Sequence, residues 1–280
     1  MVIRSIKSMV DGAMQDLTRE ADYARKAAVA AGEILKRYYG TKYEIGSKGR
    51  DNPVTVADTE ADSAIKSILT SAFPDYGWLS EETVDNSDRL DKRRVWIVDP
   101  LDGTKEFINS VPEFCVAIGL VDNGEPVVGV SYNPITDEMF WSARGMGCHL
   151  GKVRVRVTKT RILRRASVLA SRSEIARGEW EVFDGVLKAV PTGSVAYKLA
   201  MVAGGKADAT FTRSPKNEWD IASGAALIIE AGGKMTDIAG LPMKFNQKIT
   251  KCEGLIASNG ILHDELLKVA PHQGGSAKKR

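Results

Sequence analysis

The chain has 280 residues, 43% of them hydrophobic and 27% charged, which is an ordinary composition for a soluble globular protein of one large or two modest domains. Thirty-nine Lys and Arg residues against thirty-six Asp and Glu residues give a net charge of +3, which gives no reason to expect a nucleic-acid or membrane partner. No apolar run approaches the roughly 18 residues that span a bilayer. The N-terminus also lacks the apolar core of a signal peptide, so we expect a cytoplasmic protein.

Cysteine and histidine narrow the possible chemistry. The three cysteines form no CxxC pair and are expected to be free, buried thiols: Cys115, Cys148 and Cys252. The three histidines do not stand three or four positions apart, which excludes an HExxH zinc motif: His149, His263 and His272. The sequence also contains no GxSxG motif. If the chain is an enzyme, we expect carboxylates to carry its chemistry.

Two long helices are predicted first. Apolar residues recur every three or four positions over residues 17–38, and Gly40 ends that helix. The same spacing recurs over residues 55–73, where Pro74 ends the helix. We expect the two helices to lie against each other in one layer.

The middle of the chain changes to strands. Apolar runs predict strands at residues 96–98, 115–121, 127–132, 139–142 and 153–157. Asp-Asn-Gly at 122–124 predicts a hairpin turn between two of these strands. We therefore expect an antiparallel sheet that packs against the two helices.

Strands and helices alternate after about residue 160. Strands are predicted at 167–170, 209–212 and 254–257, and helices at 174–189, after Gly193-Ser194, at 220–231 and from residue 261. The predicted fold class is thus α+β followed by α/β, a layered sandwich. We expect an N-terminal half at residues 1–155 with most of the functional carboxylates, a C-terminal half at 156–270 that completes the site, and a flexible tail at 271–280.

Basic residues gather at the expected boundary between the halves. Seven Lys and Arg residues occur at positions 152, 154, 156, 159, 161, 164 and 165. Apolar residues alternate with them, so a solvated edge strand explains this run better than a nucleic-acid patch.

The segment WIVDPLDGT at residues 96–104 is the strongest local signal. An apolar strand delivers Asp99, Pro100 turns the chain, and Asp102 follows with Gly103 permitting a close approach, so both carboxylates should face one point. Like charges there repel unless a cation lies between them, and Mg²⁺ is the usual partner of carboxylate oxygens. A plain turn is the alternative, because Asp-Pro and Asp-Gly are common turn formers.

Other acidic residues could join this pair. Glu81, in Ser-Glu-Glu after a short strand, again places a carboxylate at a strand end. Asp220, in Glu-Trp-Asp, stands where a helix begins, and capping of that helix is an alternative explanation for it. Asp58 belongs to an acidic run with Glu60 and Asp62, for which a solvated helix face is the ordinary expectation.

Together these segments resemble the inositol monophosphatase superfamily of Mg²⁺-dependent, lithium-sensitive phosphatases. The resemblance rests on DPLDGT at 99–104, with SEE at 80–82 before it and WD at 219–220 and EAGG at 230–233 after it. It extends from about residue 21 to residue 267. It implies the fold of the inositol monophosphatases and sugar phosphatases, in which helix layers alternate with two sheets and the metal site lies between the halves.

The resemblance also implies a role for each matching residue. The metal ligands would be four carboxylates and one backbone carbonyl: Glu81, Asp99, Asp102, Asp220 and the carbonyl of Leu101. Asp58 and Thr104 would orient the attacking water, and Glu81 would also be catalytic. Two or three Mg²⁺ ions would neutralise the phosphate oxygens, lower the pKa of a water and hold the leaving group for in-line displacement. The substrate contacts would be Asp102 and two pairs of residues at expected helix starts, Gly103 with Thr104 and Gly193 with Ser194.

The residues after the metal motif resemble one branch of this superfamily. Lys105-Glu106-Phe107, and Glu218 before Trp219, are similar to the 3′(2′),5′-bisphosphate nucleotidases, which hydrolyse phosphoadenosine phosphate to AMP. A substrate with two phosphates needs cations outside the metal cluster, and the candidates are Arg213, Lys198 and Lys48. Two plainer explanations stay open: Lys198 could face solvent, and Lys105 could form a surface ion pair with Glu106.

Three other functions remain open at this point. The second candidate is a phosphatase of the same superfamily that acts on inositol phosphate or another sugar phosphate. A non-catalytic protein that binds a nucleotide or a metal should have a broken ligand set, and none is seen. A structural protein with an acidic patch should show no thermal shift with Mg²⁺. We expect a monomer or a homodimer.

Overall fold

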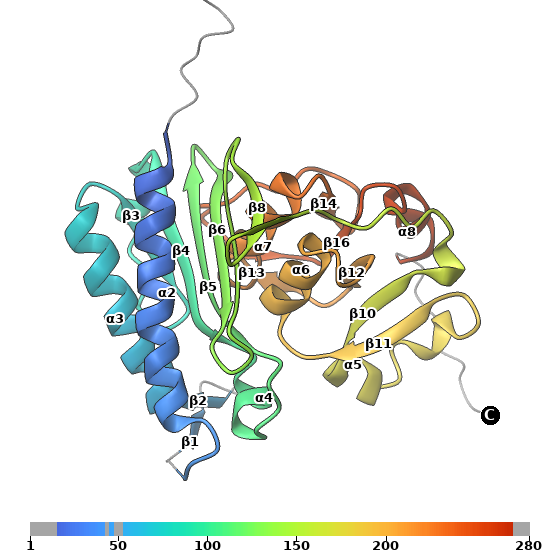
Figure 1. Ribbon diagram of the computed structural model, residues 1–280, viewed down its shortest axis with the longest axis horizontal. Coiled ribbons are helices and arrows are strands. Elements are labelled where there is room, and N and C mark those ends of the chain that lie inside the picture. Colours follow the sequence, from blue (N-terminus) through green and yellow to red (C-terminus); the bar gives the residue numbers. More distant parts are fainter. Residues whose placement is uncertain (1–15, 43–44, 48–52, 271–280) are drawn as a thin grey trace, which may run out of the picture.

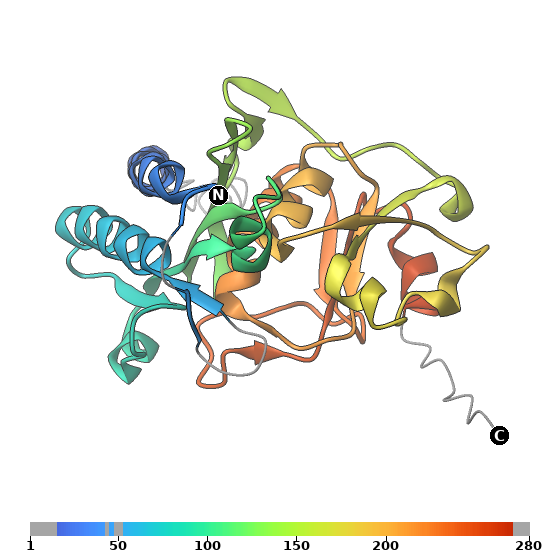
Figure 2. The same cartoon turned by 90° about the horizontal axis from the view of Figure 1, so that it is seen from below.

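The computed structural model describes residues 16–42, 45–47 and 53–270. Figures 1 and 2 show its elements in successive layers: two N-terminal helices, a large sheet, a pair of inner helices, a second sheet and a last group of helices. This alternation of helix layers with two sheets confirms the predicted fold class.

The outer helical layer consists of α2 (Thr18–Tyr38) and α3 (Val56–Ala72), close to the two ranges predicted from periodicity. The buried face of α2 is rich in alanine, and Ala24, Ala28 and Ala31 have no exposed surface. Such small side chains let the helix lie close to the sheet behind it. A short ribbon of β1 (Ile45–Ser47) and β2 (Pro53–Thr55) precedes α3.

The first sheet has seven strands in sequence order. They are β3 (Gly77–Ser80), β4 (Arg94–Asp102), β5 (Cys115–Asp122), β6 (Glu125–Asn133), β7 (Glu138–Ala143), β8 (Gly147–Leu150) and β9 (Val153–Val155). Only β3 and β4 are parallel, and the other neighbours are antiparallel, as predicted for the middle of the chain. Asn123 and Gly124 both have positive φ, which confirms the tight hairpin turn between β5 and β6.

The second sheet has five strands in the order β11-β10-β12-β16-β14. They are β10 (Ser167–Ser171), β11 (Lys188–Thr192), β12 (Ala209–Thr212), β14 (Lys234–Asp237) and β16 (Leu255–Ser258). The inner helices α6 (Val195–Ala203) and α7 (Glu218–Glu230) lie between the two sheets. The smaller elements are α4 (Thr104–Ile108), α5 (Arg172–Ala176), α8 (His263–Val269), the ribbon strands β13 (Lys216–Asn217) and β15 (Lys251–Cys252), and 3₁₀ turns at Ser87–Asp91, Leu163–Arg165 and Glu181–Phe183.

The helix predicted at residues 174–189 is wrong. Helix α5 ends at Ala176, and Gly178 and Gly185 adopt left-handed conformations, with φ of 76° at each, that an α-helix does not accommodate. The chain then forms β11, which pairs in parallel with β10. The strand predicted at 153–157 is also shorter than expected, because β9 ends at Val155.

Inner helix α7 belongs to the second half of the chain but packs on the first sheet. Strands β4 and β5 are therefore buried on both faces, by α2 and α3 on one side and by α7 on the other. Such double burial explains why their sequences are nearly continuous apolar runs rather than alternating ones. Strand β9 forms one edge of this sheet, and Val153 there is 67% exposed, as expected for a solvated edge strand.

None of the three cysteines lines the cavity beside the predicted carboxylates, and neither do His149 and His263. The three cysteines are free, with Cys115 and Cys148 buried and Cys252 half-buried. His263 is buried, with its ring nitrogens 3.0 Å from the hydroxyls of Thr236 and Ser258, while His272 lies outside the described residues.

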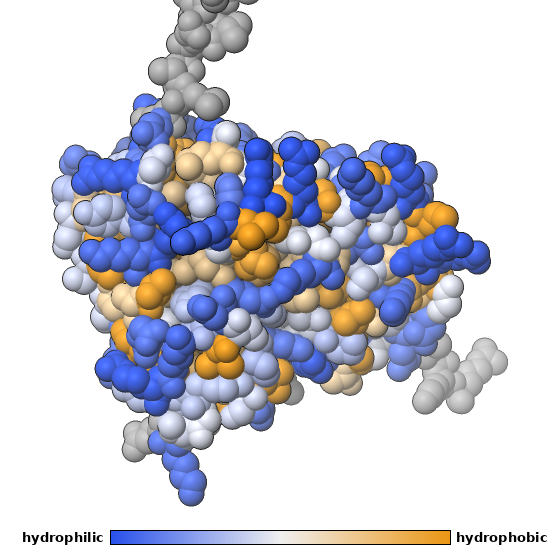
Figure 3. Space-filling model, in the orientation of Figure 1, coloured by the Kyte–Doolittle hydropathy of each residue, from blue (hydrophilic) through white to orange (hydrophobic). Residues whose placement is uncertain are grey.

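Within the described part of the chain, no helix is both long enough and apolar enough to cross a membrane. Figure 3 shows a mostly hydrophilic face with scattered apolar patches.

Candidate active site

Asp99 and Asp102 reach the same side of β4 because the strand is bulged between them. Asp99 lies opposite Ala117 of β5 and Asp102 opposite Cys115, so β4 takes three steps where β5 takes two. In a regular strand, residues three apart face opposite sides, and the extra residue removes that offset. The predicted turn at Pro100 is therefore a bulge inside a longer strand, which continues to Asp102.

Gly103 then turns the chain into α4. Its φ of 103° lies in a region that side chains rarely adopt. A Cβ atom at this position would also lie 3.0 Å from the carbonyl oxygen of Glu113. Glycine is thus required here, and it places Thr104 as the first residue of α4.

Glu81 and Asp220 come to this pair from two other elements. Glu81 directly follows β3, and its N–H donates to the carbonyl of Val98 at 3.2 Å, which places it beside the end of β4. Asp220 is the third residue of α7, and its carboxylate accepts the N–H of Asn217 at 2.9 Å, so it does cap the helix. It also points to the cluster: oxygen atoms of Glu81, Asp99 and Asp220 all lie within 4.8 Å of one another.

The electrostatics of the cluster favour a bound cation. Burial, followed by the charges of Glu81, Asp102 and Asp220, raises the pKa of Asp99 well above its ordinary value. Burial and the neighbouring carboxylates likewise raise the pKa of Asp220 to about 8. Neither Asp99 nor Asp220 forms an ion pair with any Lys or Arg in the described parts of the chain. Hard oxygen donors in a buried, mutually repelling group are the ligands that Mg²⁺ binds.

Asp102 lies beside this cluster and connects it to α6. Its Oδ2 accepts a hydrogen bond from the Ser194 hydroxyl at 2.6 Å and another from the Ala196 N–H. Burial raises the pKa of Asp102, although these hydrogen bonds and the charge of Lys198 oppose the rise. One carboxylate therefore links the bulge of β4 to the first turn of α6 in the other half of the molecule.

The structure also brings Asp58 and Thr104 together. The Thr104 hydroxyl lies 3.2 Å from Asp58 Oδ1 and 3.2 Å from the Leu101 carbonyl oxygen. The other oxygen of Asp58 accepts from the N–H and hydroxyl of Thr55, which forms the N-terminal cap of α3. Asp58 is therefore buried, and the solvated helix face that its acidic run suggested is wrong for this residue.

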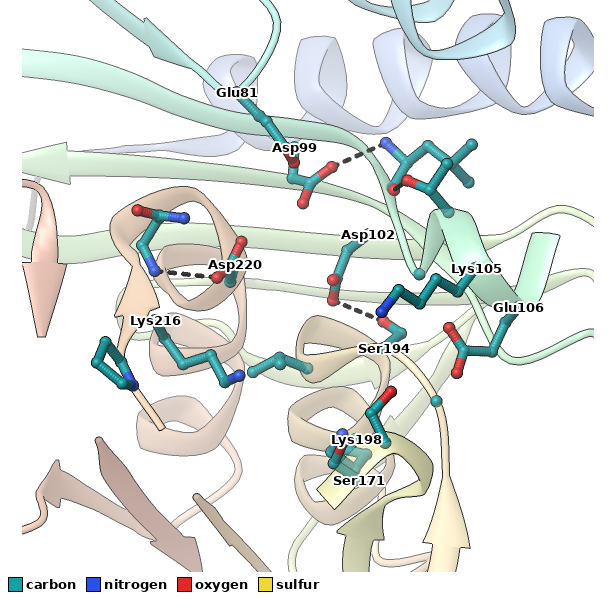
Figure 4. A pocket seen from close by; sticks show the side chains of 18 residues that line it. Glu81, Asp99, Asp102, Lys105, Glu106, Ser171, Ser194, Lys198, Lys216 and Asp220 are labelled. Carbon is teal, nitrogen blue, oxygen red and sulfur yellow. Dashed lines mark hydrogen bonds between the residues drawn. The ribbon is translucent and has the colours of Figure 1, made fainter. Parts of the chain in front are cut away.

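A cavity of about 440 Å³ opens beside these residues. Figure 4 shows the carboxylates along one side of it and Lys198 and Ser171 on the opposite side. The lining contains ten of the residues predicted for the site: Glu81, Asp99, Leu101, Asp102, Gly103, Thr104, Gly193, Ser194, Lys198 and Asp220. Asp58 stands behind Thr104, and Arg213 lies elsewhere.

Among the predicted cations, only Lys198 lines the cavity. It is 5% exposed, so it does not face solvent, and burial lowers its pKa, although the charge of Asp102 opposes the fall. The guanidinium of Arg213 instead donates to the Glu179 carbonyl at 2.7 Å and packs over the Phe183 ring, so the predicted substrate contact is not supported by its position. Lys48 lies outside the described residues.

Sequence reasoning missed several lining residues. Lys216, in the short strand β13 before α7, supplies a second cation, and Ser171 and Ser173 come from the start of α5. Lys105 and Glu106 also line the cavity, and no ion pair joins them. The one sequence signal that could have identified Lys216 as a site residue is its position four residues before the predicted metal ligand Asp220.

The raised carboxylate pKa values predict how the metal-free protein responds to pH. Asp99, Asp102 and Asp220 hold protons in the folded state at pH values where the unfolded chain has lost them. For Asp220 this contribution to stability is present below about pH 4 and is lost as the pH rises through about 8, and the raised pKa values of Asp99 and Asp102 act in the same direction. We expect the melting temperature in EDTA to fall across this range, and saturating Mg²⁺ to remove the fall.

The control for this measurement is the difference between the melting temperature in EDTA and the melting temperature in saturating Mg²⁺ at each pH. Burial lowers the pKa of His263 to about 4, so its contribution has the opposite sign and increases as the pH rises from 4 towards 6.5. That contribution is common to both conditions and cancels in the difference. A stabilisation by Mg²⁺ that does not grow with pH would contradict the assignment of these carboxylates to one cation site.

A partly buried carboxylate cluster next to a lysine-lined cavity suits an enzyme that binds divalent cations and a phosphate ester. Comparison with known proteins gives the family. The family model described as "Inositol monophosphatase family" matches residues 16–274. The chain belongs to the inositol monophosphatase family, whose members are Mg²⁺-dependent phosphatases.

Three relatives show how far the similarity extends. The "Fructose-1,6-bisphosphatase/inositol-1-monophosphatase" of Aquifex aeolicus is 33% identical, with 92% of this chain and 97% of the relative covered. The "Inositol-1-monophosphatase" of Caulobacter vibrioides is 37% identical, with 87% and 97% covered. The solved structure of an inositol monophosphatase from Anabaena (Nostoc) sp. PCC 7120 has a TM-score of 0.78 at 32% identity, with 91% and 96% covered. The likeness therefore spans nearly the whole chain.

Proposed function

We propose that the protein hydrolyses the 3′(2′)-phosphate of adenosine 3′,5′-bisphosphate to give AMP, with two or three Mg²⁺ ions held by Glu81, Asp99, Asp102, Asp220 and the Leu101 carbonyl. The membership in a phosphatase family supports the reaction class. The observation that carries the choice of a bisphosphate is a buried lysine, Lys198, in the wall opposite the carboxylates. A cytoplasmic location and a monomeric or homodimeric state remain predictions from the sequence.

Different residues of the chain have separate roles in this reaction. When bound, Mg²⁺ neutralises the phosphate oxygens and lowers the pKa of the attacking water. The Thr104 hydroxyl, held between Asp58 and the Leu101 carbonyl, orients that water. Gly103 and Thr104 line the cavity, and their backbone N–H groups would donate to the phosphate. This mechanism requires no covalent intermediate.

The second phosphate needs positive charge away from the metal cluster. Lys198 and Lys216 supply it within the cavity, and Lys198 is the more buried of the two. A buried ammonium group binds a phosphate more strongly than an exposed one, because solvent screens the pair less. Inositol monophosphate has no second phosphate to use these groups.

A second candidate substrate class is the inositol and sugar phosphates. The names of the relatives favour it. The relative from Caulobacter vibrioides is named inositol-1-monophosphatase, and the relative from Aquifex aeolicus is named fructose-1,6-bisphosphatase/inositol-1-monophosphatase. The latter name itself describes an activity on a bisphosphate, which agrees with a cavity that contains cations beside the carboxylates.

A panel of phosphate esters tests the proposal. We expect kcat/KM at saturating Mg²⁺ to be at least tenfold higher for adenosine 3′,5′-bisphosphate than for inositol 1-phosphate, because a charge-assisted contact to the second phosphate is worth roughly 1.5–3 kcal/mol. A preference for the inositol ester would overturn the nucleotidase assignment and leave the phosphatase in place. Absence of Mg²⁺-dependent turnover of every ester would overturn both.

A further inference from the structure

We propose that Asp62 is a positioning residue that fixes the backbone of the Glu81 segment and thereby sets the affinity of the site for Mg²⁺. The inference rests on the proposed function, because it concerns the same metal site. Nothing in the sequence singles out Asp62, which belongs to the acidic run expected to face solvent. The structure places it in the interior instead, where it is 6% exposed.

Both oxygens of Asp62 bind residues that flank Glu81. Oδ1 accepts a hydrogen bond from the hydroxyl of Ser80, the last residue of β3. Oδ2 accepts from the hydroxyl of Thr83 at 2.7 Å. A single carboxylate on α3 therefore holds the chain one residue before and two residues after the metal ligand.

Further hydrogen bonds complete this support. The Ser80 hydroxyl also accepts the N–H of Glu82 at 3.3 Å, and the N–H of Glu81 donates to the Val98 carbonyl. The segment from 80 to 83 is thus attached to β4 on one side and to α3 on the other. Moving this segment would break its hydrogen bonds to a buried carboxylate, which is costly.

Helix α3 supports two parts of the site in the same way. Asp58 and Asp62 are four positions apart, so they lie on the same face of the helix, one turn from each other. Asp58 binds the Thr104 hydroxyl at the start of α4, and Asp62 binds the segment that bears Glu81. Groups that orient metal ligands in this manner change metal affinity by about 10–100-fold when they are removed.

The test uses Thr83, because its change is mild enough to leave the protein folded. Thr83→Val keeps the shape of the side chain and removes the hydroxyl that binds Asp62, whereas Thr83→Ser keeps the hydroxyl. We expect Thr83→Val to weaken Mg²⁺ binding by about tenfold, at the lower end of the range for such supporting contacts, and Thr83→Ser to restore most of it. The measurement is Mg²⁺ titration of the full-length, metal-free protein by calorimetry.

Asp62→Asn extends the test, with Glu60→Gln as its matched control. Glu60 lies on the same helix and accepts the Tyr38 hydroxyl at 2.7 Å, so its change disturbs the contact of α2 with α3 and leaves residues 80–83 untouched. We expect Asp62→Asn to raise the apparent Mg²⁺ constant in turnover by about 10–100-fold and Glu60→Gln to change it less than twofold. Melting temperatures in EDTA report any common loss of stability.

The outcomes separate this inference from the proposed function. If the unmodified protein binds Mg²⁺ and hydrolyses phosphate esters while Thr83→Val and Asp62→Asn bind Mg²⁺ normally, the positioning role of Asp62 is rejected and the function stands. If both variants lose stability in EDTA without a change in Mg²⁺ affinity, Asp62 is purely structural. If the unmodified protein shows neither binding nor turnover, the proposed function itself fails.

Discussion

Asp99→Asn is expected to remove nearly all turnover while making the metal-free protein more stable. Asp99 is 2% exposed and its charged form is disfavoured by burial and by three carboxylates, so a neutral amide of the same shape removes repulsion. The Leu101 N–H, which now donates to Asp99 Oδ1 at 2.9 Å, can still donate to the amide oxygen. The same amide is a poor Mg²⁺ ligand, and loss of about 4 kcal/mol of charge stabilisation lowers kcat/KM on the order of 10³-fold.

The measurement pairs a phosphatase assay with melting curves in EDTA and in Mg²⁺. We expect the melting temperature of Asp99→Asn in EDTA to rise by about 2–4 °C for each kcal/mol of repulsion removed, and the upward shift caused by Mg²⁺ to shrink. A variant that kept full activity, or that melted lower in EDTA, would contradict the cation site.

Asp122→Asn is the matched control, because it applies the same change to a carboxylate that is already neutralised. Burial opposes the charge of Asp122, but Arg93 and Arg94 outweigh it and lower its pKa. Their guanidinium groups donate to its carboxylate at 2.9 to 3.2 Å. We expect this variant to be destabilised equally with and without Mg²⁺, which is opposite in sign to the effect at Asp99.

Sequence patterns predicted the elements of this fold wherever one pattern alone determined the local structure. The helices around Ala28 and Ile65 follow from apolar spacing, and the hairpin at Asn123 follows from its turn residues. The helix prediction for residues 174–189 failed because the acidic and apolar residues there have a helix-like spacing. Gly178 and Gly185 instead adopt left-handed conformations that fit a turn. Strand β11 is stabilised by its neighbour β10, and no local pattern in the sequence reports that pairing.

The carboxylates of the site could be predicted for a similar reason. Asp99 and Asp102 are three residues apart, and Glu81 and Asp220 follow other strand or helix boundaries, so local signals mark each of them. The bulge that turns Asp99 and Asp102 to one side depends on pairing with β5 and has no signal of its own. Lys216 and Asp62 depend on tertiary contacts, and the sequence alone therefore assigned neither of them to the site.

Lys198→Met is expected to separate the two substrate classes. Methionine fills a similar volume without the charge, so the variant removes a buried ammonium and should fold at least as well as the unmodified protein. We expect kcat/KM for adenosine 3′,5′-bisphosphate to fall about 10–150-fold, which corresponds to one charge-assisted contact of roughly 1.5–3 kcal/mol. Turnover of p-nitrophenyl phosphate, which has one phosphate, should change less than threefold.

Lys105→Met is the matched control on the opposite wall. Lys105 also lines the cavity but is exposed, so its charge is screened and its removal should lower kcat/KM for the bisphosphate by less than about fivefold. Equal losses on both substrates in Lys198→Met would show that this lysine supports the metal site through Asp102 and does not bind a second phosphate. Loss of the Lys198 charge would raise the pKa of Asp102 further under either outcome, so the comparison of the two substrates decides between them.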